Sequence, residues 1–437
     1  MQRKSFTHVL GVIVLAVFLT ACISNGSEFL GIPLTQATPI PTITPVPTLE
    51  VMTPVPVVEE TTESPAQEPV NTLLVWVPPF MDPANETLAG DLLAAKLAAF
   101  VAKTPNVEIE IRVKSEEGPA SLIASLTAVS AVAPLELPSL IILDRSDLEN
   151  AAKKGLILPM GDYSTIINEI GWFQYARSLS VISDSSYGLP LVGEALVMVV
   201  RPAEEPENAE IANEQLAFWP ADPNVSLMLN DYLAVGGDLL NEENQVVLSL
   251  SELTSVYSQI ALMRDSELLS PNLTAITSHA DAWERFKSGE VNMVILPSSF
   301  PLVDLPADSR IVPLDSITDF DHTLATGWTI ALVDPLPERR NLSVALAESL
   351  TEVSFLGQWS EALDMMPVRG ESFSYWQKEA VAQRLSVISL SARIYPSQEI
   401  IQIVSPAMQA GLTALLTQDV SPEGAAQIAI DSLTVED

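Results

Sequence analysis

Short apolar runs rich in β-formers alternate with segments of helical periodicity from residue 71 onward, and this alternation limits the possible folds most. Strands are predicted at residues 72–77, 107–113, 139–143, 194–200, 291–296 and 328–333. Helices are predicted at residues 86–103, 120–131, 147–154, 226–235, 250–267, 279–288 and 342–355, and through most of 376–433. Such an order packs as a mostly parallel sheet with helices on both faces, so the predicted fold class is α/β.

The charge and composition exclude several classes of function. The 437 residues carry 21 Lys+Arg against 56 Asp+Glu, a formal net charge of −35, so binding to nucleic acid has no electrostatic basis. One cysteine and three histidines leave no cysteine-based metal site and little for a histidine triad. We expect no metal and no cofactor.

The first 22 residues predict an export signal and a lipid anchor. Arg3 and Lys4 precede an apolar stretch at residues 9–19, which is too short to span a bilayer and suits a signal peptide. The sequence that follows, Leu-Thr-Ala-Cys, resembles a bacterial lipobox and ends at Cys22, the single cysteine of the chain. We therefore expect residues 1–21 to be cleaved and Cys22 to carry fatty acyl chains.

Residues 22–70 are rich in proline and threonine, and this composition predicts an extended linker without a core. The linker would hold the folded body, residues 71–437, away from the lipid. The predicted location is the extracytoplasmic face of the bacterial cell envelope. Outside the N-terminal stretch no apolar run reaches 18 residues, so no further membrane span is expected.

Several segments of the folded part, in order along the chain, resemble motifs of one protein family. They read FVAKTPNV at 100–107, PSLII at 138–142, GLILPM at 155–160, YGLP at 187–190, GGDLL at 236–240, FKSGEVNM at 286–293, GWTIAL at 327–332 and MPVR at 366–369. Together they resemble the extracellular solute-binding proteins of ABC importers, family 1, in the carbohydrate-binding group related to maltose-binding protein. In this interpretation Phe286 and Met293 are core anchors, and Gly289 ends a helix.

The resemblance implies a two-lobe, type II periplasmic-binding-protein-like fold with a hinge between the lobes. One lobe would hold roughly residues 71–199 and 314–366, and the other roughly 200–313 and 367–437. A small-molecule solute, expected to be a carbohydrate, would bind in the cleft and be delivered to the transmembrane subunits of an ABC permease. The protein would be a monomer and not an enzyme, so no catalytic residue is expected.

Sugar binding uses aromatic faces and polar side chains that fork to adjacent hydroxyl groups, and the candidates follow from strand ends and from the resemblance. The aromatic and neighbouring candidates are Trp76, Ser299, Phe300, Trp328 and Trp376, and the charged candidates are Asp82, Asp144, Arg145, Glu194 and Arg369. For each of them, core packing or a surface ion pair is the alternative. Trp172, Trp219, Trp283 and Trp359 are predicted to be core residues, and His279 is predicted to lie beside a helix cap.

Two alternatives remain open at the level of sequence. The family usually has Tyr-Asn where this chain reads VVRP at 199–202, and a tryptophan-rich run where it reads LPSSF at 296–300. A relative that serves as a sensor or scaffold rather than in transport would fit these departures. An exported carbohydrate-active enzyme needs only two carboxylates, although no G-x-S-x-G, H-E-x-x-H, S-x-x-K or P-loop motif is present.

Overall fold

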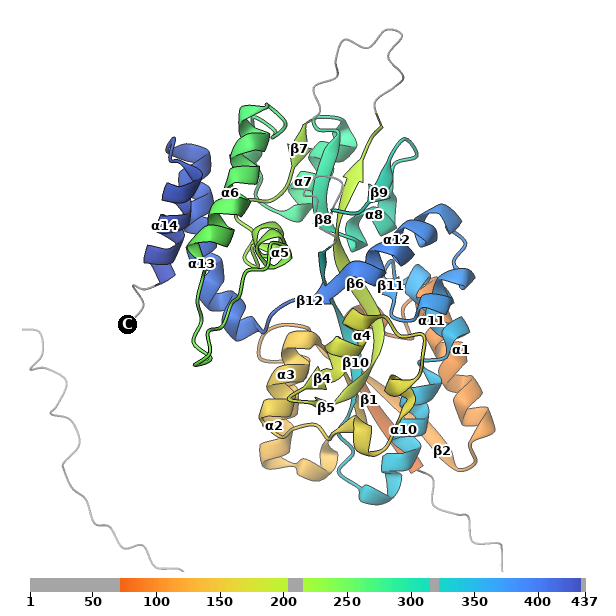
Figure 1. Ribbon diagram of the computed structural model, residues 1–437. Helices are drawn as coiled ribbons and strands as arrows, with labels where there is room; N and C mark the ends of the chain where they lie inside the picture. The colour runs from red at the N-terminus through yellow and green to blue at the C-terminus, as the bar shows by residue number, and fades with distance from the viewer. Residues whose placement is uncertain (1–70, 203–214, 315–321, 434–437) are drawn as a thin grey trace, which may run out of the picture. The chain divides into compact units, whose positions relative to one another are not determined.

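The computed structural model describes residues 71–202, 215–314 and 322–433, all in one compact unit (Figure 1). The predicted signal peptide at 1–21, the lipidation site Cys22 and the linker at 22–70 lie outside the described residues. They therefore remain predictions from the sequence.

The strands lie close to where the apolar runs place them, with several short additions. They are β1 Asn71–Val77, β2 Val107–Val113, β3 Leu140–Asp144, β4 Val181–Ile182, β5 Ser185–Ser186, β6 Gly188–Val200, β7 Leu216–Ala217, β8 Met293–Pro297, β9 Arg310–Val312, β10 Thr323–Leu332, β11 Met366–Pro367 and β12 Ala392–Ile394.

The helices confirm the predicted alternation. They are α1 Leu88–Lys103, α2 Leu122–Val132, α3 Arg145–Lys153, α4 Gln174–Ser180, α5 Ser226–Ala234, α6 Leu250–Asp265, α7 His279–Ser288, α8 Ser299–Asp304, α10 Arg340–Ser349, α11 Val353–Ala362, α12 Glu379–Ser391, α13 Gln398–Thr417 and α14 Pro422–Leu433. Short 3-10 turns are η1 Pro79–Met81, η2 Pro134–Glu136, η3 Met160–Asp162, η4 Ile166–Asn168, η5 Leu273–Ala275, η6 Pro337–Arg339 and η7 Gly370–Tyr375.

The main sheet is mixed rather than mostly parallel. Its order is β2-β1-β3-β10-β6-β8-β7, with β9 and β11 paired to β6 and β12 paired to β10. The outer pairs β1–β2, β1–β3 and β7–β8 are parallel, whereas β10 runs antiparallel to β3 and β6, and β6 antiparallel to β8. The parallel pairs follow from helical crossovers, and the central antiparallel strands carry the chain from one half of the sheet to the other.

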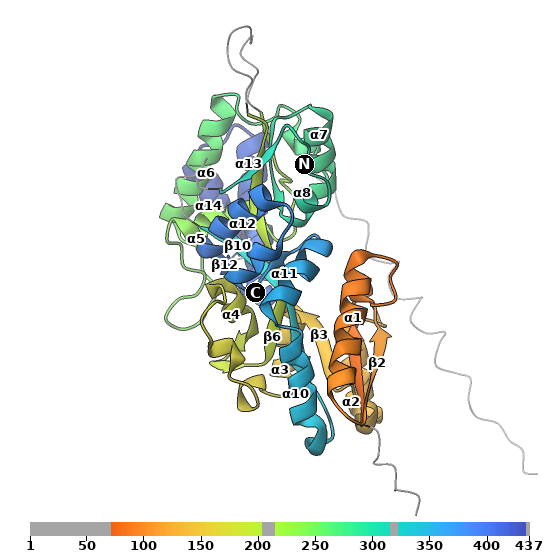
Figure 2. The same cartoon turned by 90° about the vertical axis from the view of Figure 1, so that its right-hand side faces the viewer.

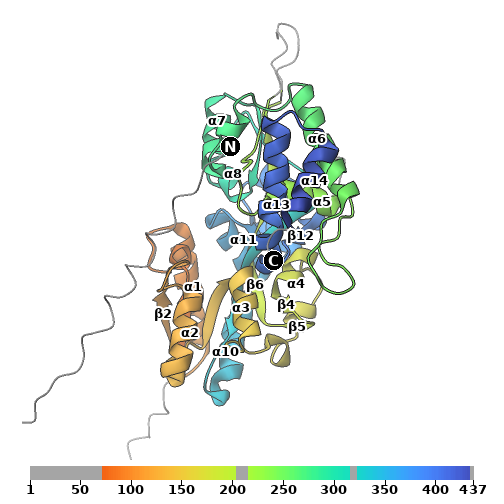
Figure 3. The ribbon, with the colours of Figure 1, turned by 90° about the vertical axis from the view of Figure 1, so that its left-hand side faces the viewer.

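Helices cover both faces of the sheet, as the continuous apolar strands require. In β1, Leu73, Val75 and Val77 point into a core formed with α1, whereas Trp76 points into a separate core beneath α2 and α3. This alternation reflects the two-residue period of a strand. Figure 2 shows α1 and α10 on one side, and Figure 3 shows α2 and α3 on the other.

The long strands β6 and β10 run through the centre and connect two groups of helices (Figure 1). The helices α1–α4, α10 and α11 gather at one end, and α5–α8, α13 and α14 at the other. Where these two antiparallel strands pair between the two groups of helices, Gly193 of β6 lies opposite Gly327 of β10. A Cβ on Gly193 would collide with the Tyr175 ring, and one on Gly327 with the Val192 carbonyl, so both positions require glycine.

Two local expectations were wrong in their boundaries, and a third was confirmed. The helix predicted at 342–355 is two helices, α10 and α11, because the chain leaves the helical path at Leu350–Glu352. The strands β6 and β10 begin about five residues earlier than predicted, because both continue from one half of the sheet into the other. The predicted helix end at Gly289 is confirmed, with φ +81° in the left-handed region.

One helix among the described residues, α13, is long and apolar enough to cross a membrane by length and composition alone. Half of its apolar window is buried, and it packs against α14 and α6. Its apolar residues are therefore accounted for by packing within this body.

Candidate functional site

A cavity of about 420 Å³ lies where the midpoints of β6 and β10 meet the carboxyl ends of β3 and β8. In open α/β sheets this is where ligands bind, and the volume lies within the roughly 300–1,000 Å³ of ligand pockets. The polar and aromatic lining comprises Asp144, Arg145, Ser146, Glu149, Glu194, Trp219, Asp222, Asn224, Ser226, His279, Thr326, Tyr395 and Gln398. We call this space the central cavity.

One wall of the central cavity is the tight loop that leads into α5. The Asp222 carboxylate accepts hydrogen bonds from the backbone N–H groups of Asn224 at 3.0 Å and Ser226 at 2.9 Å. Val225 is held at φ 43° and ψ 38°, a left-handed conformation that a β-branched residue rarely adopts. Strained backbone of this kind clusters at functional sites, where the surrounding contacts impose it.

His279 lies in the same wall, at the first position of α7. Its ring is 5.2 Å from the Trp219 ring in an edge-to-face arrangement and 6.2 Å from the Phe300 ring. Burial lowers the pKa of His279, partly offset by Asp222, whose Oδ2 lies 3.7 Å from Nε2. The imidazole is therefore neutral near pH 7 and forms part of an aromatic surface rather than a cationic site.

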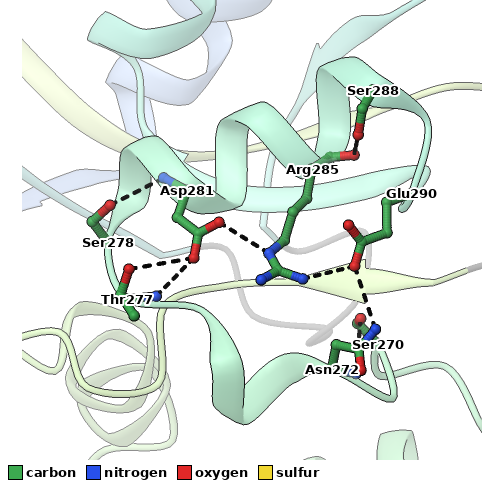
Figure 4. Close-up of polar contacts among 8 residues, drawn as sticks. All are labelled: Ser270, Asn272, Thr277, Ser278, Asp281, Arg285, Ser288 and Glu290. Carbon is green, nitrogen blue, oxygen red and sulfur yellow. Dashed lines mark hydrogen bonds and ion pairs between the residues drawn. The ribbon is translucent and has the colours of Figure 1, made fainter.

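A polar network fixes the start of α7 and so positions His279 (Figure 4). Ser278 Oγ accepts from the Asp281 backbone N–H at 3.0 Å, and Asp281 accepts from the Thr277 backbone N–H and from Arg285 Nε. Arg285 then reaches Glu290 at 2.7 Å, just beyond the end of the helix. Both ends of α7 are thereby tied to its neighbours.

Two predicted acids, Asp144 and Glu194, lie in the central cavity on different strands. Asp144 ends β3 and caps α3 by accepting from the Asp147 backbone N–H at 2.7 Å. Glu194 lies in the middle of β6, opposite Thr326 of β10, and accepts from the Ser299 backbone N–H at 3.3 Å. Burial raises the pKa of both carboxyl groups, with hydrogen bonds opposing the shift.

Arg145 lines the central cavity, but its guanidinium group is engaged elsewhere. Nη1 donates to three backbone carbonyl oxygens between Ser178 and Val181 at 2.8 to 3.3 Å. Arg145 therefore fastens the end of α4 to the cavity wall. Tyr395, from the segment before α13, presents a phenol that interacts with the Ser226 side chain, and burial raises the pKa of this phenol.

Three candidates from the sequence lie outside the central cavity, in the core. Trp76 is 2% exposed, beneath α2 and α3, and Trp376 is 4% exposed, with its Nε1 donating to Ser360 Oγ at 3.1 Å. Arg369 lies over the Trp172 ring at 4.8 Å and pairs with Glu169 at 3.3 Å. A strand-end position for Trp76, and positions just past the last crossing between the lobes for Trp376 and Arg369, favoured ligand contact. Packing between helices and sheet buries them instead.

The remaining candidates do not line the central cavity. Trp328 is half-buried, packs edge-to-face on Phe80 at 5.1 Å, and lies opposite Asp144 in the sheet. Asp82 accepts from the Ala84 backbone N–H at 2.8 Å in the turn after η1. Ser299 and Phe300 lie at the start of α8, where they line a smaller surface pocket of about 310 Å³ with Trp283 and Lys287.

Sequence reasoning missed the wall formed by Trp219, Asp222, His279 and Tyr395. Trp219 is partly buried and packs against the core, as predicted, but it also lines the cavity, which was not predicted. Trp172, Trp283 and Trp359 are buried as predicted. The four residues of this wall lie in loops or at the start of a helix, where no periodicity in the sequence shows which side chains face the cavity. The Asp-Pro-Asn sequence at 222–224, typical of a turn before a helix, was the one available signal. No group of three or more metal-ligating side chains occurs in the described ranges.

Comparisons with known proteins give a clear result only for structure. No protein-family model matches the sequence, and no curated protein matches it. Among solved structures, the sugar-binding protein MalE from Xanthomonas citri is similar with a TM-score of 0.66 and 15% identity, over 83% of this chain and 97% of that one. Extracellular solute-binding protein family 1 from Alicyclobacillus acidocaldarius is similar with a TM-score of 0.62 and 15% identity, over 84% of this chain and 98% of that one. The GacH receptor of Streptomyces glaucescens, solved unliganded and with acarbose, is similar with a TM-score of 0.56 and 18% identity, over 84% of this chain and 98% of that one.

These matches span nearly the whole length of the solved proteins, and their sequence identities are low. The likeness therefore lies in the overall arrangement of strands and helices. The chain has the type II periplasmic-binding-protein fold, the fold of the maltodextrin-binding proteins and of an extracellular solute-binding protein of family 1.

Proposed function

We propose that this protein captures a carbohydrate solute in the central cavity and delivers it, without chemical change, to an ABC importer in the membrane. The observation that carries the proposal is the combination in one cavity of aromatic rings with carboxylate, amide and hydroxyl groups. Trp219 and Tyr395 supply ring faces, and Glu194, Asp222 and Asn224 supply polar groups. Sugars are recognised by this combination, since their C–H faces pack on rings and their hydroxyl groups need paired partners.

The position of the cavity supports the same function. Glu194 and Thr326 come from the two long strands, Asp144 from one half of the sheet, and Asp222 from the other half. A solute held there contacts both halves at once, so its binding favours the form in which they approach each other. We propose the lobes to be roughly residues 71–199 with 314–366, and 200–313 with 367–437.

The test is a thermal-shift screen of the full chain in detergent against neutral and amino sugars, oligosaccharides, polyols and amino acids. We expect at least one sugar to raise the melting temperature, and calorimetry to confirm it. Trp219→Ala should weaken that binding by about 10- to 100-fold, because one stacked ring contributes roughly 1.4 to 2.7 kcal/mol. Tyr375→Ala removes an exposed ring outside the cavity and is the matched control. Binding of amino acids alone would contradict the proposal.

We further propose that residues 1–21 direct export and that Cys22 anchors the mature protein through its acyl chains. Two or more acyl chains hold a protein stably on a membrane, and the linker at 22–70 then gives the binding body its reach. Labelling with a palmitate analogue should mark the wild-type chain and not Cys22→Ala. Equal labelling of both would contradict the anchor.

The residue that stands in place of the usual Tyr-Asn does not line the central cavity. Arg201 pairs with Asp308 at 2.9 Å and lies over the Phe286 ring at 4.4 Å, so it holds β6 to α7. The departure therefore gives no support to a sensor or scaffold in preference to a transport protein. A hydrolase is tested by incubating the protein with the oligosaccharides of the screen and assaying for new reducing ends, which hydrolysis would release.

A further inference from the structure

Of the four acids that line the central cavity, one forms an ion pair with a lysine and three have no lysine or arginine partner among the described residues. Glu149 pairs with Lys153 at 3.0 Å, and Lys153 also reaches Glu399 at 3.0 Å. In the part of the chain that the structure describes, no lysine or arginine forms an ion pair with Asp144, Glu194 or Asp222. These three acids come from β3, from β6 and from the loop before α5, so they border the cavity from three directions.

The two basic side chains in the lining are engaged in other ways. Arg145 is a cation at neutral pH, but the N–H groups of its Nη1 are directed to three backbone carbonyl oxygens. Burial lowers the pKa of His279, which leaves this ring neutral near pH 7. The cavity therefore contains three acids with which no lysine or arginine of the described residues forms an ion pair. Burial raises the pKa of Asp144 and Glu194, and an ammonium group beside them would favour their charged forms.

The aromatic wall reinforces this preference. The rings of Trp219, His279 and Tyr395 line the same space, and the face of an aromatic ring carries partial negative charge that attracts cations. Trp219 Nε1 and His279 Nδ1 are buried and have no hydrogen-bond partner among the described residues. The indole N–H is a donor only, so it is suited to a hydroxyl oxygen of the same ligand rather than to its ammonium group. Asp222 is 5% exposed, and its two oxygens are held by backbone N–H groups, so it offers a preorganised carboxylate.

We propose that the solute carries a protonated amine: an amino sugar or an amine-bearing oligosaccharide, held between Asp144, Glu194 and Asp222. The inference rests on the proposed function and adds the charge of its ligand. A neutral sugar can satisfy the hydrogen bonds of these acids but brings no charge to balance theirs. An ammonium group can satisfy the same hydrogen bonds and also supplies the opposite charge.

The experiment compares matched sugars by calorimetry on the full chain. The probes are glucosamine with glucose, galactosamine with galactose, and the β-1,4-linked glucosamine disaccharide with cellobiose and the N-acetylated form. We expect the amine form of at least one set to bind about 10-fold or more tighter than its hydroxyl and acetylated counterparts, and added salt to reduce the difference. Equal or tighter binding of the neutral forms overturns the inference and leaves carbohydrate binding intact. If no sugar in these sets or in the wider screen binds, the proposed function fails, and the inference with it.

Variants of the acids give a second readout. Asp144→Asn keeps the cap of α3, since asparagine is also a good cap, and Glu194→Gln keeps an acceptor for the Ser299 N–H. Each should reduce the amine preference, measured as the ratio of amine-sugar to neutral-sugar affinity in the same variant, to about threefold or less. Asp91→Asn removes an exposed charge in the first turn of α1 and should leave the preference unchanged. Retention of the full preference in both cavity variants overturns the inference.

Discussion

Asp231 is a buried acid whose ionisation should make the stability of the protein depend on pH. Its side chain lies within α5 and is 1% exposed. Oδ1 accepts from Asn230 Nδ2 at 3.1 Å, while Oδ2 has no partner among the described residues. Burial raises the pKa of Asp231 from 3.8 to about 7. Since the folded-state pKa exceeds the unfolded one, the folded chain binds the proton more tightly.

The sign of the effect follows from this order of the two pKa values. Below about pH 4 Asp231 is protonated in both the folded and the unfolded state, so its ionisation does not change the free energy of unfolding. Between about pH 4 and 7 the unfolded state loses its proton first, so the free energy of unfolding falls as pH rises, and above about pH 7 the loss is complete. Three pKa units correspond to roughly 4 kcal/mol, of which roughly 2 to 3 kcal/mol develop between pH 5 and pH 8.

Asp231→Asn removes the titration and keeps the size of the side chain. For each pH we take the free energy of unfolding of the variant minus that of wild type. We expect this difference to be larger at pH 8 than at pH 5 by roughly 2 to 3 kcal/mol, which means that the substitution stabilises the protein more at the higher pH. Urea denaturation followed by tryptophan fluorescence measures both values, and other titrating groups cancel in the difference. Asp91→Asn, an exposed acid in α1, is the control and should show no such difference. Equal effects at the two pH values, or a larger gain at pH 5, would refute the reasoning.

Three further predictions concern stability. Arg339→Ala should cost about 3 to 5 kcal/mol in urea denaturation, because it leaves the fully buried Asp334 carboxylate without its cation, and a loss under 1 kcal/mol would contradict this. Gly327→Ala should lower the free energy of unfolding by about 1 to 3 kcal/mol, since its Cβ would collide with the Val192 carbonyl where β6 and β10 pair. An unchanged melting temperature would contradict this and would show that the two strands can move apart there. Lys153→Ala should change the free energy of unfolding by under about 1 kcal/mol, because its ion pairs are exposed, and a larger loss would mean that they hold α3 to α13.

The sequence predicted the strands and the fold class well, because buried strands and amphipathic helices leave periodic patterns. The run at 72–77 became β1, and Gly289 ended its helix as expected. The mixed direction of the sheet was missed, since no local pattern reports whether a strand returns parallel or antiparallel. That direction depends on how distant segments pair, as when β10 inserts between β3 and β6.

The candidate site was only partly predictable for a related physical reason. Asp144 and Glu194 were found because they lie at or near strand segments, where a sheet exposes its ligand-facing edge. Trp219 and Tyr395 lie in irregular segments far apart in sequence, and only the folded arrangement brings their rings to one cavity. Trp76 resembled a cleft residue from its position in a strand, yet the alternation of β1 turns it into the core.

A crystal structure of the full chain with the solute found in the screen tests the central claim most directly. The account predicts that the solute occupies the cavity between β6, β10 and the loop before α5, with a ring on Trp219 and polar groups on Glu194 and Asp222. A solute bound outside that cavity, with the cavity filled only by water, would contradict the account.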